Sequence, residues 1–310
     1  MAFLDAAVII VGLVVFEIIN SVDNSIINAN ILGEMGKIWR KRFLVVGILT
    51  SVFLVRFILP FIILWLSSPQ LSAMDAVRSF TGTGNEATAA AVEAQKPVIL
   101  IFGGVFLLYL YWHWVFLEKK YPLFLERFVK KEFGIWFFGF AAISLVVIMS
   151  LARFSPNMMI AAALGSATFF ILYGFKENSE KAEKRILKGT GVGDISKFLY
   201  LEILDATFSF DGVIGAFAFT TNVIYILIGL GIGAIVVRQL TVRGIKHIGK
   251  YRWLKNGAMT SIGFLGLFML FESFGTELPA YIPTAATFIF LGIAFYKSHI
   301  YLKSTRRNRN

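Results

Sequence analysis

Carboxylates inside long apolar stretches are the residues of this chain most able to do chemistry. Glu17 and Asp23 lie in the first apolar stretch, Asp205 and Asp211 lie in the sixth, and the spacing within each pair is the same. A charged side chain at the centre of a bilayer costs about 2.5–3.5 kcal/mol, so such groups are expected only where they pair, line a wet cavity or bind something. The repeated spacing therefore predicts a cation or proton site.

Neutral polar residues accompany these acids on the same helix faces. At about 100° per residue, one face about 140° wide holds the oxygen-bearing side chains of the first stretch. These are Glu17, Asn20, Asp23, Asn24 and Asn28. In the sixth stretch Ser209 shares a face with Asp205, and Glu202 adds a further acid. Gly212 favours a local break in the helix directly after Asp211. We expect Asn20, Asn28 and Ser209 to support a site made by the acids.

Two arginines, Arg56 and Arg238, fall within or near the apolar stretches. We expect them to act as counter-charges rather than as ligands, because a guanidinium repels a cation. The acids outnumber these arginines, so a bound cation or protons must balance the remaining negative charge. Glu272 lies near the outer end of the eighth stretch, where a structural ion pair and a side chain reaching the membrane interface are equally good interpretations.

The types of donor restrict the ion and the chemistry. Carboxylate, amide and hydroxyl oxygens suit Mn²⁺, Ca²⁺ or Mg²⁺. Zinc and copper sites usually need Cys and His, whereas this chain has no Cys and only three His. Protons are the other candidate ion. No Walker loop and no catalytic nucleophile arrangement is found in the sequence, which indicates neither an organic cofactor nor an enzyme.

The elements that must position these residues are membrane helices. The 310 residues are 57% hydrophobic and only 16% charged, with a mean hydropathy of +0.73, which disfavours a soluble domain and a nucleic-acid binder. Apolar runs of about 20 residues match the thickness of a bilayer core. They predict an all-α polytopic membrane protein with about nine spans. We place these near 6–28, 43–66, 97–117, 134–151, 156–175, 199–219, 222–242, 257–275 and 281–299.

The distribution of basic residues predicts the orientation of these spans. Of the 30 Lys and Arg residues, 26 lie in alternate connecting segments and the tail, and only three lie in the segments on the other side. The positive-inside rule then puts the N-terminus outside and the C-terminus in the cytoplasm of a plasma (inner) membrane. The long outer loop, 67–96, is expected to have helical stretches at 73–80 and 87–94. We expect residues 304–310 to form a disordered basic tail that touches anionic lipid.

The two acidic stretches would cross the membrane in opposite directions, which is typical of an inverted-repeat transporter with its site between the repeats. We therefore expect one transmembrane domain, 1–303. Its first repeat covers about 1–117, its second repeat about 199–299, and linker helices occupy 134–175. The sequence leaves a homo-oligomer open.

Three segments resemble a known family. Phe16–Leu32 (FEIINSVDNSIINANIL), Leu201–Thr220 (LEILDATFSFDGVIGAFAFT) and Gly47–Pro60 (GILTSVFLVRFILP) are similar to helices of the TerC family of integral membrane proteins, and closest to a less-studied branch of that family. TerC-like proteins are associated with tellurium resistance, and several are manganese exporters. Gly212 and Asn20 depart from the family pattern, which bears on ion selectivity. The resemblance implies a metal site formed by Glu17, Asp23, Asn24, Asp205 and Asp211, with Glu202 taking part.

Three functions are compatible with these features. The first is a divalent-cation transporter, with export of Mn²⁺ preferred and protons as the counter-ion. The second is a non-transporting membrane scaffold or accessory protein of a tellurite or metal stress-response complex. The third is a membrane enzyme that uses the acids for acid–base chemistry, which would need a cleft and a nucleophile.

Overall fold

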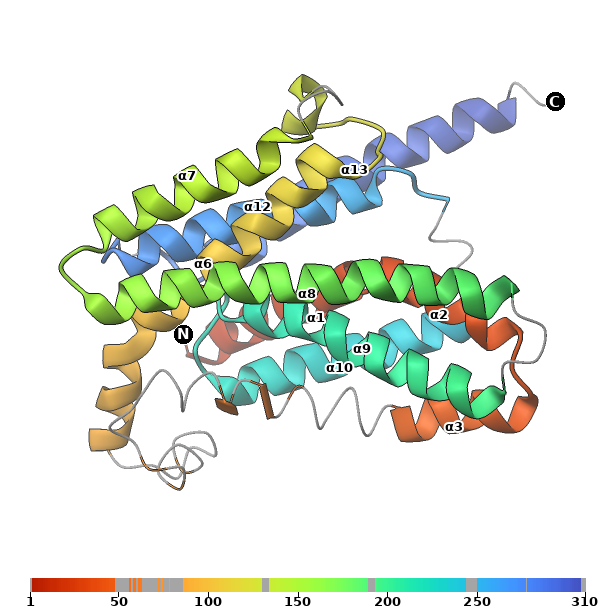
Figure 1. Ribbon diagram of the computed structural model, residues 1–310, viewed down its shortest axis with the longest axis horizontal. Coiled ribbons are helices and arrows are strands. Elements are labelled where there is room, and N and C mark those ends of the chain that lie inside the picture. The colour runs from red at the N-terminus through yellow and green to blue at the C-terminus, as the bar shows by residue number, and fades with distance from the viewer. Residues whose placement is uncertain are drawn as a thin grey trace.

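Apolar stretches of the sequence form long helices in the computed structural model (Figure 1). The structure describes residues 2–47, 56, 58–59, 61–62, 72, 74, 78, 86–129, 134–188, 193–243, 250–276 and 278–307. The elements are α1 (Ala2–Asn20), α2 (Val22–Gly33), α3 (Lys37–Gly47), α6 (Glu86–Leu117), the short 3-10 helix η2 (Leu125–Phe128), α7 (Trp136–Leu151), α8 (Pro156–Lys188), α9 (Asp194–Ala216), α10 (Val223–Arg243), α12 (Leu254–Ser273) and α13 (Ile282–Arg307). Within these ranges no strand occurs, which confirms the expected all-α class.

Within the described residues, five helices are long and apolar enough to cross a membrane: α6, α8, α10, α12 and α13. The protein is therefore a membrane-embedded helical protein. Four further expected spans do not meet the same standard in the described residues. The first is divided between α1 and α2, and the second (43–66) lies mostly outside the described residues. The helix α7 has only 16 residues, and α9 carries four carboxylates. The full set of nine spans and the inverted repeat remain predictions.

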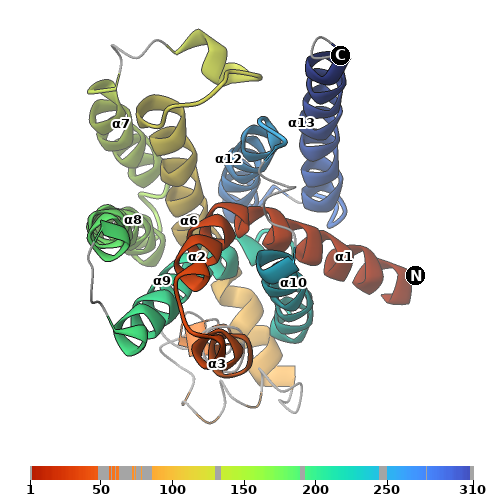
Figure 2. The same cartoon turned by 90° about the vertical axis from the view of Figure 1, so that its right-hand side faces the viewer.

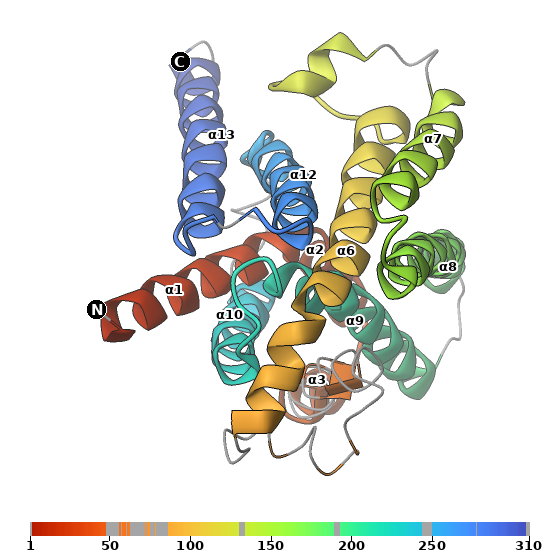
Figure 3. The ribbon, with the colours of Figure 1, turned by 90° about the vertical axis from the view of Figure 1, so that its left-hand side faces the viewer.

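Pairwise helix contacts connect the bundle (Figures 2 and 3). The helix α6 lies between α12 and α8, α13 packs on α12 and α1, and α1 packs on α10. Two ion pairs define the direction of α12 relative to α6. Lys255 pairs with Glu118 just beyond the end of α6, and Lys96 near its start pairs with Glu272 at 2.8 Å. The two helices are therefore antiparallel, and Glu272 has a structural partner.

Glycines allow the closest helix contacts. In α6 and α12, a Cβ added to Gly104 would lie 3.0 Å from the carbonyl oxygen of Gly266. In α10, a Cβ at Gly233 would lie 2.7 Å from the Cβ of Glu17, and one at Gly229 would overlap Leu13 of α1. Small residues four apart are a common way for membrane helices to approach each other closely. This packing brings the backbone of α10 directly against Glu17.

The break in the acidic region differs from the expected one. The first stretch is interrupted at Ser21, where α1 ends and α2 begins one residue later. The Ser21 hydroxyl donates to Glu17, so the interruption lies beside the first acid. By contrast, α9 continues without a break through Gly212. The absence of a side chain at Gly212 instead makes room for Glu17, because a Cβ there would lie 2.7 Å from Glu17 Oε2.

Three boundaries also differ from the expected ones. Residues 87–94 are helical as the start of α6, which runs on through Pro97. The connector after 175 is helical and continuous with α8 as far as Lys188. The helix α13 continues to Arg307, so residues 304–307 are helical rather than a disordered tail. The expected helix at 73–80 falls almost wholly outside the described residues.

Candidate functional site

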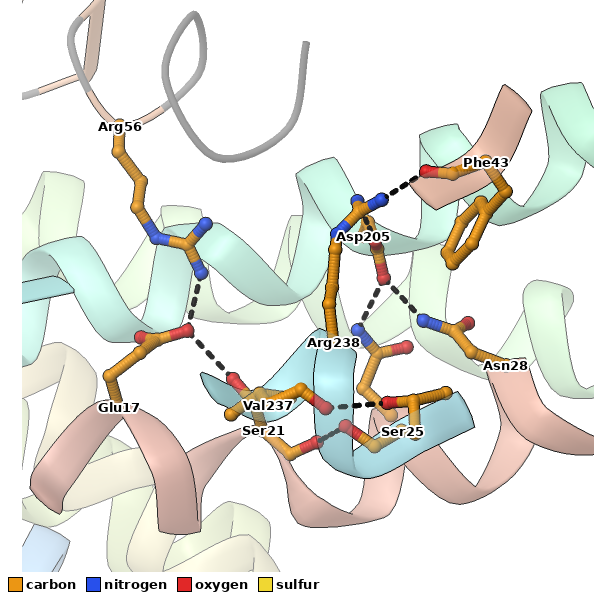
Figure 4. A network of polar contacts seen from close by, with 11 residues as sticks. Glu17, Ser21, Ser25, Asn28, Phe43, Arg56, Asp205, Val237 and Arg238 are labelled. Atoms are coloured by element: carbon orange, nitrogen blue, oxygen red, sulfur yellow. Dashed lines mark hydrogen bonds and ion pairs between the residues drawn. The ribbon is translucent and has the colours of Figure 1, made fainter. Parts of the chain in front are cut away.

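Glu17 of α1 forms the first polar centre (Figure 4). Its side chain is only 1% exposed, and Oε1 pairs with the guanidinium of Arg56 and accepts a hydrogen bond of 2.8 Å from Ser21 Oγ. The other oxygen, Oε2, is buried and has no hydrogen-bond partner among the described residues. It faces Gly212 of α9. One oxygen of this carboxylate is therefore neutralised, and the second is available.

Asp205 of α9 forms the second polar centre, and both of its oxygens are used (Figure 4). Oδ1 accepts hydrogen bonds from Asn24 Nδ2 at 2.7 Å and Asn28 Nδ2 at 2.6 Å, whereas Oδ2 pairs with Arg238 at 2.6 Å. Arg238 also donates to the carbonyl oxygen of Phe43 at 2.6 Å, and its guanidinium lies 4.4 Å from the centroid of the Phe43 ring. The network ties α2, α3, α9 and α10 together.

Asp211 occupies a different setting from these two acids. It lines a cavity of about 520 Å³, and no described residue forms an ion pair or hydrogen bond with it. Asn20 and Ile27 line the same cavity from the acidic region, and His113 and Tyr173 line it from α6 and α8. A cavity of this size is large enough for several water molecules or a hydrated ion. Asp211 is thus an accessible carboxylate on a largely apolar helix.

The far end of the cavity is lined by charged residues. Glu118, just after α6, pairs with Lys255 at 2.5 Å and lies 3.9 Å from Lys176 of α8. Burial raises the pKa of Glu118, but the two ammonium groups outweigh that effect, and its pKa is below the ordinary value. Glu118 is therefore ionised at neutral pH and links α6, α8 and α12 at the cavity rim.

Glu17 and Asp211 both lie next to Gly212, the first in space and the second in the sequence. The Cβ position of Gly212 is 2.7 Å from Glu17 Oε2 and 3.8 Å from Asn20 Nδ2, and Gly212 directly follows Asp211 in α9. Asn20 and Asp211 both line the cavity, whereas Glu17 Oε2 is buried beside Gly212. The acidic helices α1 and α9 therefore meet at this point, as the contacts between them also indicate.

A family model described as "Protein of unknown function (DUF475)" matches residues 22–307, which is most of the chain. The chain belongs to the DUF475 family. No curated protein matches the chain. No solved structure matches it either.

The described carboxylates of this DUF475 chain do not form one cluster. Within the described part, no three acidic or histidine side chains lie close enough to hold a metal ion. The side chain of Asp23, a central member of the expected set, lies outside the described residues. Glu202 and Arg238 both lie next to Gly47. Ser209 is buried, and its hydroxyl has no hydrogen-bond partner among the described residues. Of the acids expected to form the site, Glu17 and Asp205 are thus paired with arginine, whereas Asp211 faces the large cavity.

Two cavity residues were missed as functional residues in the sequence. His113 lies near the end of an apolar stretch, a position typical of an interfacial residue, yet it is buried and lines the cavity that holds Asp211. Lys176 belongs to a basic connecting segment of the sequence, yet it lines the same cavity from α8. Their contribution depends on how α6 and α8 pack against α9. The only available signal was a histidine and a lysine near the ends of two apolar stretches, and such residues are common at membrane interfaces.

Proposed function

We propose that this protein is an integral membrane transporter of divalent cations, with Mn²⁺ as the preferred substrate. The observation that carries the proposal is the environment of Asp211. This carboxylate lies on α9, faces a cavity of about 520 Å³, and has no described ion-pair partner. Ionisable groups in such positions mark ion pathways in many membrane proteins.

The donors around Asp211 suit a hard cation. Asn20 lines the cavity with Asp211, and the unpartnered Oε2 of Glu17 lies on the other side of Gly212. Asp23 follows Asn20 by three residues in the sequence, and we propose it as an additional ligand. Amide and carboxylate oxygens are the ligands that Mn²⁺, Ca²⁺ and Mg²⁺ prefer. The resemblance to TerC proteins, which include manganese exporters, favours Mn²⁺.

The arginines act as built-in cations in this proposal. Arg56 neutralises one oxygen of Glu17, and Arg238 neutralises Asp205. Their presence lets these acids stay buried when no substrate is bound, because a guanidinium supplies the charge that a metal would supply. Movement of α1 relative to α9 would then exchange an arginine for the substrate cation at Glu17.

The cavity gives the proposed pathway a direction. Its charged rim includes Glu118, Lys176 and Lys255, which belong to segments rich in Lys and Arg. The positive-inside rule assigns these segments to the cytoplasm. The cavity is therefore the inward-facing half of a pathway in a plasma membrane, with the N-terminus outside and the C-terminus inside. Export of a divalent cation against an inside-negative potential costs about 4.6 kcal/mol per 100 mV, so we propose counter-transport of protons as the driving force.

Ion flux in reconstituted vesicles tests this proposal. We expect the wild-type protein to carry Mn²⁺, and Asp211→Asn to abolish the flux while the protein still inserts into membranes. Glu272→Gln is the matched control, because it also neutralises an acid of an apolar helix, but one that pairs with Lys96 away from the cavity. Comparing Mn²⁺, Ca²⁺ and Mg²⁺ identifies the ion. Equal flux in wild type and Asp211→Asn would reject the site, and a cellular phenotype that survives Asp211→Asn would favour the scaffold function.

A further inference from the structure

The helix α3 changes character halfway along its length. Its first half carries the basic residues Lys37, Arg40, Lys41 and Arg42, and its second half, from residue 43, is apolar. The change falls where the expected second span begins. At about 1.5 Å per residue the basic half extends about 9 Å from that point, which is comparable to a headgroup layer of about 5–8 Å. We therefore expect the basic half of α3 at the level of the lipid headgroups.

One face of α3 is fixed to the rest of the protein. Phe43 is 1% exposed, and its carbonyl oxygen accepts a hydrogen bond of 2.6 Å from Arg238 (Figure 4). Trp39 packs against α9, and Arg40 donates to two carbonyl oxygens around the end of α2. The helix lies at the edge of the bundle (Figure 2). These contacts determine which side of α3 points away from the protein.

The outer face of α3 combines exposed apolar and basic side chains. Ile38 is 70% exposed and Val45 is 64% exposed, and at about 100° per residue they project in nearly the same direction. Lys37 and Lys41 lie on one side of this apolar strip, and Arg42 lies on the other. Apolar side chains bordered by basic ones are typical of helices that contact a membrane surface.

The two lysines of this outer face have no negative partner in the part of the chain that the structure describes. Lys37 and Lys41 are exposed and four residues apart, a spacing at which like charges on a helix repel each other. The acids near the start of α3 are used elsewhere. Glu34 lies 3.5 Å from a lysine of α9, and Asp194 accepts a hydrogen bond from the backbone N–H directly before α3. The outer face therefore offers two ammonium groups to an external anion.

We infer that the outer face of α3 binds an anionic phospholipid of the surrounding membrane. Its two lysines contact the phosphate of the headgroup, and Ile38 and Val45 lie against the acyl chains. A bilayer lipid matches both the basic and the apolar part of this face, whereas a soluble phosphate matches only the basic part. The lipid binds on the helix that holds Arg238 through the Phe43 carbonyl. The inference goes beyond the proposed function and does not depend on transport.

Local quenching of a fluorophore tests this inference. The chain has no cysteine, so a fluorophore on Ile38→Cys reports only the surroundings of α3 in the full-length protein in vesicles. The measurement compares quenching by spin-labelled phosphatidylglycerol with quenching by spin-labelled phosphatidylcholine. One basic residue near an anionic surface strengthens the attraction about fivefold, so we expect a preference for phosphatidylglycerol of at least about fivefold. Lys37→Gln with Lys41→Gln should remove most of this preference, and Lys37→Arg with Lys41→Arg should keep it.

Ile289→Cys is the matched control position. Ile289 is 59% exposed on α13, and the nearest basic residue of that helix, Lys297, lies about two turns further along. A fluorophore there should be quenched nearly equally by the two lipids. Equal preference at both positions, or a preference at Ile38→Cys that survives Lys37→Gln with Lys41→Gln, would overturn the inference. Loss of the preference in inorganic phosphate, but not in sodium chloride of the same ionic strength, would also overturn it, because the site would then take a soluble anion.

Discussion

At the scale of single residues, Glu17, Asp205 and Asp211 differ in how many of their carboxylate oxygens have a partner. Asp205 has three donors, from Asn24, Asn28 and Arg238, and is fully satisfied. Among the described residues, Glu17 has partners at one oxygen only, and Asp211 has none at either oxygen. The sequence allowed Arg56 and Arg238 to be interpreted as counter-charges, because acids in apolar stretches need partners. The sequence did not show which arginine pairs with which acid, because that pairing depends on which helix faces meet.

The contacts of Arg238 predict a large structural effect of its removal. Arg238→Ala would leave Asp205 as a buried charge without its cation, which typically costs about 3–5 kcal/mol of stability. Melting of the detergent-solubilised protein measures this loss. Glu34→Gln is the control, since Glu34 is 43% exposed in its 3.5 Å pair with Lys197. Exposed pairs are typically worth about 1 kcal/mol or less. Equal melting temperatures for the two variants would contradict a structural role for the Arg238–Asp205 pair.

At the scale of elements, the sequence predicted where several helices lie, but it did not predict where a helix is interrupted. The apolar runs at 97–117, 222–242 and 257–275 correspond closely to α6, α10 and α12, because run length and composition determine whether a segment can span a bilayer. The interruption at Ser21 lies beside a hydrogen bond from the Ser21 hydroxyl to Glu17. Gly212, where α9 continues, lies against Glu17 of α1. Neither contact is visible from hydropathy.

Two glycines of α10 provide a direct test of the α1–α10 contact. A Cβ at Gly233 would lie 2.7 Å from the Cβ of Glu17 and 3.0 Å from the carbonyl oxygen of Val14, whereas a Cβ at Gly231 would have nothing within 4 Å. Gly233→Ala should therefore destabilise the protein by about 1–3 kcal/mol through overpacking. Gly231→Ala should be neutral or slightly stabilising, because alanine favours helix formation. Thermal melting compares the two, and similar melting temperatures would argue against the tight contact.

At the scale of the whole molecule, the cavity is the feature that sequence patterns could not reveal. It is lined from α1, α2, α6, α8, α9 and α12, so its residues come from almost the whole length of the chain. The sequence predicted that the acids of the first and sixth stretches would converge, and α1 and α9 do meet at Gly212. The separate surroundings of Asp205 and Asp211 arise from side chains on helices whose packing the sequence does not specify.

The central claim is that a cavity open to the basic side of the membrane leads a divalent cation to Asp211. The absence of cysteine makes single-cysteine labelling a direct test. Leu110 lines the cavity, whereas Leu107, three residues earlier in α6, is fully buried and serves as the control. The measurement is the rate at which a membrane-impermeant thiol reagent modifies Leu110→Cys from each side of a vesicle, with and without Mn²⁺.

We predict modification of Leu110→Cys from the side of the basic loops only, and slower modification when Mn²⁺ is present. The Mn²⁺ effect should disappear when Asp211→Asn is added, and Leu107→Cys should stay unmodified throughout. Modification of Leu110→Cys from neither side, or at a rate that Mn²⁺ does not change, would contradict the account.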